Sequence, residues 1–222
     1  MTALSLLQLV SPALPVGAFS YSEGLEVLIQ AGDLCEETQL LDWLEAELTQ
    51  GMLRLEAAAL PLLAADVSAW CAGESAARQR LLELDGWLLA TREAAEVRAQ
   101  QRQMGQSLLQ LLVDMDHPLP EPIHLSWPAA WAAAAVALNV PALAMVEGYL
   151  YGWVANQLSA SVRLLPLGPS RAQVLQQRLL PLIAEQARQL QDCDPRTLWS
   201  GGVGAGLAQL NHAELYSRLF RS

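Results

Sequence analysis

The chain has 222 residues and a formal net charge of −10; 53% of its residues are hydrophobic and 16% are charged. This composition predicts a packed globular protein and excludes a disordered one. The acidic balance argues against nucleic acid as a partner, because binding to phosphates requires positive charge. Lysine is absent and every basic residue is arginine, which excludes the lysine-dependent P-loop, Schiff-base and kinase sites.

Strong helix formers dominate the chain, chiefly leucine, alanine, glutamine, glutamate and arginine. Apolar residues recur at helical spacing, and no segment shows the alternation that is typical of a strand. No linker and no internal repeat divides the sequence. We therefore predict an all-α fold, a helical bundle of about ten helices in a single domain over residues 1–222.

The segment Ser11–Glu26 contains two prolines, which hold the backbone extended, and then Ser20 and Glu23 at the spacing of a capping box. This spacing predicts a helix from Tyr21 to Gly32. We expect apolar side chains of the segment to pack into the bundle and polar ones to form part of a partner-binding face. The expected anchors are Leu14, Val16 and Phe19, and the expected partner-facing residues are Tyr21, Ser22 and Glu23.

The middle of the chain is predicted to be helical from Ala76 to Met115, with a possible break at Gly86. Its polar stretch Thr91–Gly105 is expected to face solvent or another chain. The apolar segment Trp127–Met145 contains Asn139-Val-Pro, which is typical of a turn. Each half is too short to cross a bilayer, so we predict a buried helical hairpin and no membrane span. Ser170 with Gln173 predicts another capping box.

Residues that could hold a metal are scattered. The three histidines and three cysteines lack the spacing of a zinc site, and the cysteines suit packing in a reducing cytosol. We expect no metal site, no cofactor and a cytoplasmic location. One alternative stays open: Asp114 and Asp116 could bind Mg²⁺ in an all-α enzyme, although alternate residues do not share one helical face.

The tail, residues 207–222, follows a glycine cluster that predicts a flexible loop. It combines aromatic, leucine and arginine residues, the types enriched at interface hot spots. We expect it to dock on a partner, with packing onto its own bundle as the alternative. The residues concerned are Tyr216, Arg218, Leu219, Phe220 and Arg221.

Several stretches resemble the urease accessory protein UreF family, and the resemblance covers nearly the whole chain. They are Leu14-Pro-Val-Gly with Ser20-Tyr-Ser-Glu-Gly-Leu-Glu, Met104-Gly-Gln-Ser-Leu-Leu, Gly148-Tyr-Leu-Tyr-Gly-Trp through Pro166-Leu-Gly, and Tyr216-Ser-Arg-Leu-Phe-Arg-Ser. The family pattern is broken where Ala213 and Leu215 replace a Glu and a Gln, and where Pro169 replaces a Gln, so we assign no polar role to these positions.

The resemblance implies an all-helical, usually dimeric protein without catalytic activity. It further implies an adaptor that joins UreD (also called UreH) to the GTPase UreG, which carries nickel, and that regulates GTP-dependent nickel insertion into apo-urease. A structural homodimer without partner-dependent effects is the second alternative, beside the Mg²⁺ enzyme.

Overall fold

The computed structural model describes residues 2–222, and over this range it contains ten α-helices, three 3₁₀ helices and no strand. The predicted all-α fold is confirmed. In chain order the elements are α1 (Thr2–Leu9), η1 (Ala18–Ser20), α2 (Leu25–Ala31), α3 (Glu37–Gln50), α4 (Leu53–Cys71), α5 (Ser75–Ala90), α6 (Ala95–Asp114), α7 (Trp127–Ala137), α8 (Ala142–Leu164), α9 (Pro169–Leu190), η2 (Pro195–Thr197), α10 (Val203–Asn211) and η3 (His212–Glu214).

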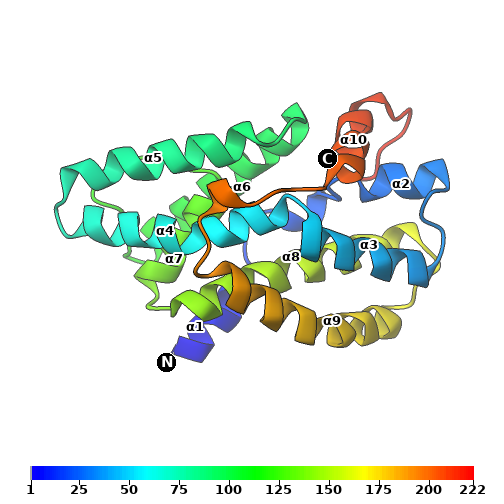
Figure 1. Ribbon diagram of the computed structural model, residues 1–222, viewed down its shortest axis with the longest axis horizontal. Helices are drawn as coiled ribbons and strands as arrows, with labels where there is room; N and C mark the ends of the chain where they lie inside the picture. Colours follow the sequence, from blue (N-terminus) through cyan, green and yellow to red (C-terminus); the bar gives the residue numbers. More distant parts are fainter. Residues whose placement is uncertain (1) are drawn as a thin grey trace.

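Helix α4 is the centre of the bundle. It contacts α3, α5, α7, α8 and α9, and Figure 1 shows it running between α5 on one side and α7 and α8 on the other. A helix that is apolar on nearly all sides can only be stable when neighbours cover it. The largely apolar sequence of α4, in which Arg54, Glu56 and Asp66 are the charged residues, is therefore the reason for its central place.

The contact between α4 and α7 is built from small side chains. Ala57–Ala59 of α4 and Ala132–Ala135 of α7 are buried, and alanine lets two helix backbones approach closely. Helices α7 and α8 form the predicted hairpin: Asn139 has a positive φ of 54°, and Pro141 precedes the first turn of α8. None of the helices described for residues 2–222 is long and apolar enough to span a membrane.

Four predicted boundaries are wrong. The break between α5 and α6 falls at residues 91–94, not at Gly86, and α10 begins at Val203, so part of the glycine cluster is helical and residue 207 lies inside a helix. No capping box forms at Ser170, because α9 already begins at Pro169. A capping box does form at α3, between Glu36 and Gln39. The fourth wrong boundary, the start of α2, is explained with the site below.

The polar stretch Thr91–Gly105 also differs from expectation. Arg92, Gln100 and Gln101 are buried, because their polar groups pair with side chains from other helices rather than with water. These pairings form the centre of the candidate site.

Candidate functional site

Helix α2 begins at Leu25, not at Tyr21, because a distant part of the chain takes the amide groups that the capping box would use. The main-chain N–H groups of Ser22 and Glu23 both donate to the main-chain oxygen of Ser222, at 2.7 and 3.1 Å. Glu23 and Gly24 then adopt positive φ angles of 52° and 92°. At Gly24 a side chain would also meet α10, since an added Cβ would lie 3.0 Å from the Gln209 nitrogen.

Glu23 lies buried where three helices meet. Its Oε1 accepts from Gln100 Nε2 of α6 at 2.6 Å, and its Oε2 accepts from Trp153 Nε1 of α8 at 3.0 Å. Its main-chain oxygen accepts from the Gln209 side chain of α10 at 3.3 Å. The carboxylate therefore ties α6 and α8 together directly beneath the last residue, Ser222, whose hydroxyl donates to Gln100 Oε1.

Glu56 is a second buried carboxylate, on α4. Its Oε1 accepts from the Arg92 guanidinium at 2.5 and 2.8 Å, and its Oε2 accepts from the Tyr149 hydroxyl at 2.8 Å. Burial raises the pKa of Glu56, and the positive charge of Arg92 opposes that shift. Burial also raises the pKa of Tyr149, and the Glu56 charge adds to this shift, so the hydroxyl remains a donor.

Glu47, on α3, is the third carboxylate of the group. It is 9% exposed, and burial raises its pKa to about 7, with Arg92 lowering it and Glu23 raising it further. Three buried carboxylates thus share one buried arginine. We call Glu23, Glu47, Glu56 and Arg92, with the Gln100, Gln101, Tyr149 and Trp153 side chains around them, the carboxylate network.

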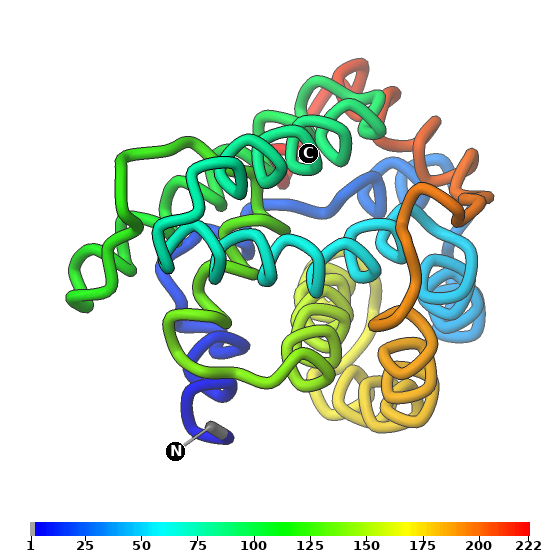
Figure 2. The backbone as a smooth tube through the Cα atoms, turned by 60° about the vertical axis from the view of Figure 1, so that its left-hand side comes forward, coloured from blue at the N-terminus to red at the C-terminus, as the bar shows by residue number. Residues whose placement is uncertain are grey.

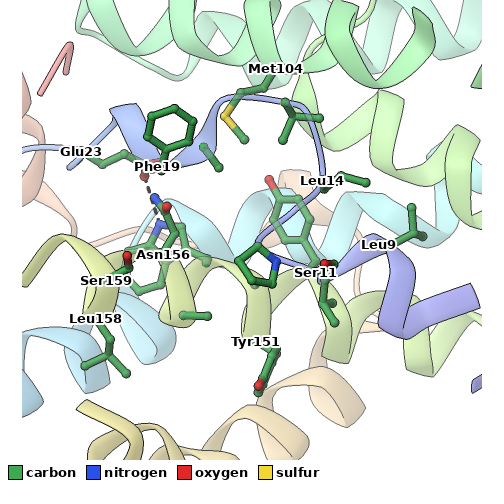
Figure 3. A pocket seen from close by; sticks show the side chains of 18 of the residues that line it. Leu9, Ser11, Leu14, Phe19, Glu23, Met104, Tyr151, Asn156, Leu158 and Ser159 are labelled. Atoms are coloured by element: carbon green, nitrogen blue, oxygen red, sulfur yellow. Dashed lines mark hydrogen bonds between the residues drawn. The ribbon is translucent and has the colours of Figure 1, made fainter. Parts of the chain in front are cut away.

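A cavity of about 550 Å³ lies next to the network. Figure 3 shows it with Glu23 at one end and Leu9 at the other, and with Tyr151 and Asn156 of α8 along its wall. Glu56, Gln101 and Gln176 also line it. Most of its wall is apolar, contributed by the segment after α1 and by α7, α8 and α9.

The tail passes over the network and is fixed by its main chain. Besides the amides of Ser22 and Glu23, which precede α2, the Ser22 hydroxyl donates to the Ser222 oxygen at 2.8 Å, and the Arg221 N–H donates to the main-chain oxygen of Ser20 at 2.9 Å. Phe220 is buried under the Arg163 guanidinium, which lies 4.1 Å from the ring centroid. Figures 1 and 2 both place the C-terminus close to the N-terminal segment that leads into α2.

Other side chains of the tail, unlike that of Phe220, are exposed to solvent. Tyr216 is fully exposed and Leu219 is 57% exposed, and the half-exposed Arg218 pairs with Glu96 of α6 at 2.7 Å. Helix α10 adds an apolar stripe at positions i, i+4 and i+7. It consists of the exposed Val203, Leu207 and Leu210. We call this stripe, together with Tyr216 and Leu219, the tail face.

The predicted site residues therefore fall into two sets. Tyr216, Arg218, Leu219 and Arg221 are exposed, whereas the other four are buried within this chain. The buried ones are Tyr21, Ser22, Glu23 and Phe220. Of the expected anchors, Val16 is buried and Leu14 is half-buried, but Phe19 is exposed and does not anchor the loop.

The sequence reasoning missed Glu47, Glu56 and Arg92. A usable signal was present for Glu56, because a charged residue inside the largely apolar first half of α4 must find a partner when it is buried. Asp114 and Asp116 are both exposed. Among residues 2–222 no group of three or more His, Cys, Asp or Glu side chains is placed to hold a metal ion.

Comparison with known proteins identifies the family. The UreF family model matches residues 34–180. Curated proteins named urease accessory protein UreF are similar over nearly their whole length: that of Microcystis aeruginosa (strain NIES-843) is 40% identical, with 99% of this chain and 97% of the relative covered. The chain belongs to the UreF family.

Other UreF relatives agree. The protein of Thermosynechococcus vestitus (strain BP-1) is 39% identical, with 99% of this chain and 97% of the relative covered, and that of Prochlorococcus marinus subsp. pastoris (strain MED4) is 38% identical, with 96% of each covered. The family resemblance found in the sequence motifs is thus confirmed.

Proposed function

We propose that this chain is the adaptor that joins UreD (UreH) to the GTPase UreG in a complex that activates apo-urease by GTP-dependent nickel insertion. In this role it acts without catalytic activity or a cofactor of its own, in the cytoplasm and as a homodimer within the larger complex. Membership of a family of urease accessory proteins supports the role. Within the chain, the observation that carries it is the tail face.

The tail face has the features of a docking surface. The backbone of its tail part is held by hydrogen bonds to Glu26 and Gln30 of α2, so less backbone entropy is lost on binding. It combines an exposed tyrosine with exposed leucines, and the exposed Arg218 and Arg221 lie in the same tail; aromatic and arginine side chains supply most of the energy of typical interfaces. Its apolar helix stripe extends the area available. We propose UreD as the protein that binds it.

The buried residues Tyr21, Ser22 and Glu23 take a different place in this proposal. Because Ser22 and Glu23 bind the Ser222 oxygen, they support the tail from beneath. We propose that they act on partner binding, including recruitment of UreG, by fixing the tail rather than by direct contact.

The test is co-purification of the full chain with UreD, UreG and the urease proteins, comparing wild type with the double variant Tyr216→Ala/Leu219→Ala. Because both side chains are exposed, the variant should keep its melting temperature, and we expect at least a roughly tenfold loss of UreD binding. The matched control is Val174→Ala/Leu180→Ala, which removes two exposed apolar side chains from α9. Equal UreD binding by both double variants and wild type would contradict the docking role of the tail face.

A further inference from the structure

His212 lies between two carboxylates that come from different helices, and no part of its side chain is exposed. Its Nδ1 is 2.7 Å from Glu96 Oε2 of α6, and its Nε2 is 3.5 Å from Glu26 Oε2 of α2. The first distance is a hydrogen bond; the second is too long for a well-formed one but is a close charge contact. Both ring nitrogens therefore face anions.

The same two carboxylates hold the tail. Glu26, which is 1% exposed, accepts from the main-chain N–H of Leu219 at 2.7 Å and of Phe220 at 3.0 Å. Glu96 accepts from the Arg218 guanidinium at 2.7 Å. The groups form a row, Glu26, His212, Glu96 and Arg218, in which the imidazole lies between the two acids.

The position of the imidazole decides which protonation state fits. Nδ1 must carry a hydrogen to donate to Glu96. In the neutral ring Nε2 would then present a lone pair to the Glu26 carboxylate, and two acceptors would face each other in a buried site. The imidazolium presents a hydrogen to each carboxylate, so it alone matches the geometry of both contacts.

We propose that His212 is an imidazolium that clamps the tail onto α2 and α6, so that its proton controls how firmly Tyr216–Phe220 is held. Among residues 2–222 no other cationic side chain forms an ion pair with Glu26: Arg218 pairs with Glu96, Glu214 on His212's own turn is an exposed acid, and Gln30, which also donates to Glu26 at 3.1 Å, is neutral. The claim that the clamp regulates partner binding at the tail face rests on the proposed function. The claim that it holds the tail in place does not.

The expected direction follows from the charges. With the proton present, two carboxylates are balanced by His212 and Arg218. When the imidazolium loses its proton, the buried Glu26 loses the one cation that is in charge contact with it among residues 2–222. The tail is then held less firmly, so the clamp is closed at low pH and loosens at high pH.

The test is amide hydrogen exchange of the full chain, read at Leu219 and Phe220, whose N–H groups bind Glu26. Protection is expressed relative to amides of α4, which report global unfolding. Hydrogen bonds to charged groups contribute about 1.5–3 kcal/mol, so we expect tail protection in wild type to fall roughly tenfold to hundredfold between about pH 5.5 and pH 8.5. In His212→Gln it should be low at both pH values. His124→Gln, at an exposed loop histidine, should behave as wild type.

Two results would overturn the clamp. One is tail protection in wild type that does not change with pH and equals that of His212→Gln. The other is a pH-dependent loss that persists in His212→Gln, since this would assign the titration to another group. If His212→Gln fails to fold, the ring ¹⁵N shifts of wild type decide: His212 with a single ring proton while Leu219 and Phe220 are protected would also overturn the proposal.

UreD binding, measured on the same variants, separates the clamp from the proposed function. If tail protection depends on His212 but UreD binds wild type and His212→Gln equally well, the clamp stands and the docking role of the tail face fails. If tail protection is the same in wild type and His212→Gln, the clamp fails, whatever the result of the UreD binding measurement.

Discussion

Two contacts of this molecule are built on opposite principles. Helices α4 and α7 meet through buried alanines, with apolar side chains and close backbones. The tail meets α2 and α6 through carboxylates, one histidine and main-chain amides. The first contact can only be lost by unfolding the bundle, because its surface gains nothing from water. The second consists of groups that water can also satisfy, so it can open while the bundle stays folded.

The carboxylate network lies between these two regions and belongs energetically to the first. Its central pair, Glu56 and Arg92, is buried among helices of the core, so the partners can separate only if those helices move. A polar contact is thus reversible at the tail and obligatory in the core. Both contacts are buried. The difference is that the tail can leave without separating the core helices, whereas Glu56 and Arg92 cannot part unless those helices move.

The largest expected effect tests the obligatory pair. Arg92→Met leaves the Glu56 carboxylate buried without a cation, and breaking such a pair costs about 3–5 kcal/mol of unfolding free energy. Arg92→Met/Glu56→Gln should recover part of the loss, because the carboxylate that bonds Arg92 directly is then neutral, although Glu23 and Glu47 still lack the charge of the arginine. Urea denaturation measures both, with Arg102→Met at an exposed position of α6 as the control. If Arg92→Met were as stable as Arg102→Met, the Glu56–Arg92 pair would be a reversible contact like that of the tail.

The pH dependence of stability tests how completely the Glu47 carboxyl is buried in the core. Its pKa is raised from 4.5 to about 7 by burial, so the folded state binds its proton more tightly than the unfolded state. The carboxyl therefore makes unfolding free energy fall as pH rises from about 4.5 to about 7, by roughly 3 kcal/mol in total. Glu47→Gln cannot ionise, so its unfolding free energy should lack this fall with rising pH.

The difference in unfolding free energy between Glu47→Gln and wild type isolates this group, because other titrating residues cancel. We expect the variant to gain roughly 3 kcal/mol relative to wild type between pH 4.5 and pH 8. Glu45→Gln, at an exposed position of the same helix, should show no such trend. A difference that is constant with pH would mean that Glu47 is solvated in the folded protein.

The packing of the apolar contact between α4 and α7 can be tested by introducing a larger side chain. Ala133→Leu adds three carbons where α7 meets α4, and the helices must move apart or the side chain must adopt a strained rotamer. We expect a loss of about 1–3 kcal/mol in unfolding free energy. Ala142→Leu, at the exposed first residue of α8, is the matched control and should be near neutral. If the two variants were equally stable, the α4–α7 contact would be looser than its alanines indicate.

The sequence predicted the parts of the fold that depend on local periodicity. The all-α fold, the buried hairpin of α7 and α8 and the end of α2 at Gly32 follow from spacing, turn residues and glycine. These signals lie within about one helix length, so a single sequence contains them.

The polar interior could not be predicted in this way, because its partners are far apart in the chain. Glu56 pairs with Arg92, 36 positions away, and with Tyr149, 93 positions away. The start of α2 was wrong for the same reason: the acceptor for its first amides, Ser222, lies 200 positions from Ser22. An arginine- and glutamine-rich helix face has the same pattern whether it meets water or a buried carboxylate.

The smallest effect concerns the tail itself. The Ser22 hydroxyl donates to the Ser222 oxygen at 2.8 Å, but two main-chain N–H groups donate to the same oxygen. Ser22→Ala therefore removes one of three donors and should cost only about 1 kcal/mol of tail protection, with little change in global unfolding free energy. Ser20→Ala, two residues earlier, should change neither. Hydrogen exchange at Phe220 measures the local effect, and urea denaturation measures the global one. If Ser22→Ala lowered global stability as much as local protection, the tail would unfold only with the bundle, and the distinction between a reversible and an obligatory polar contact would not hold.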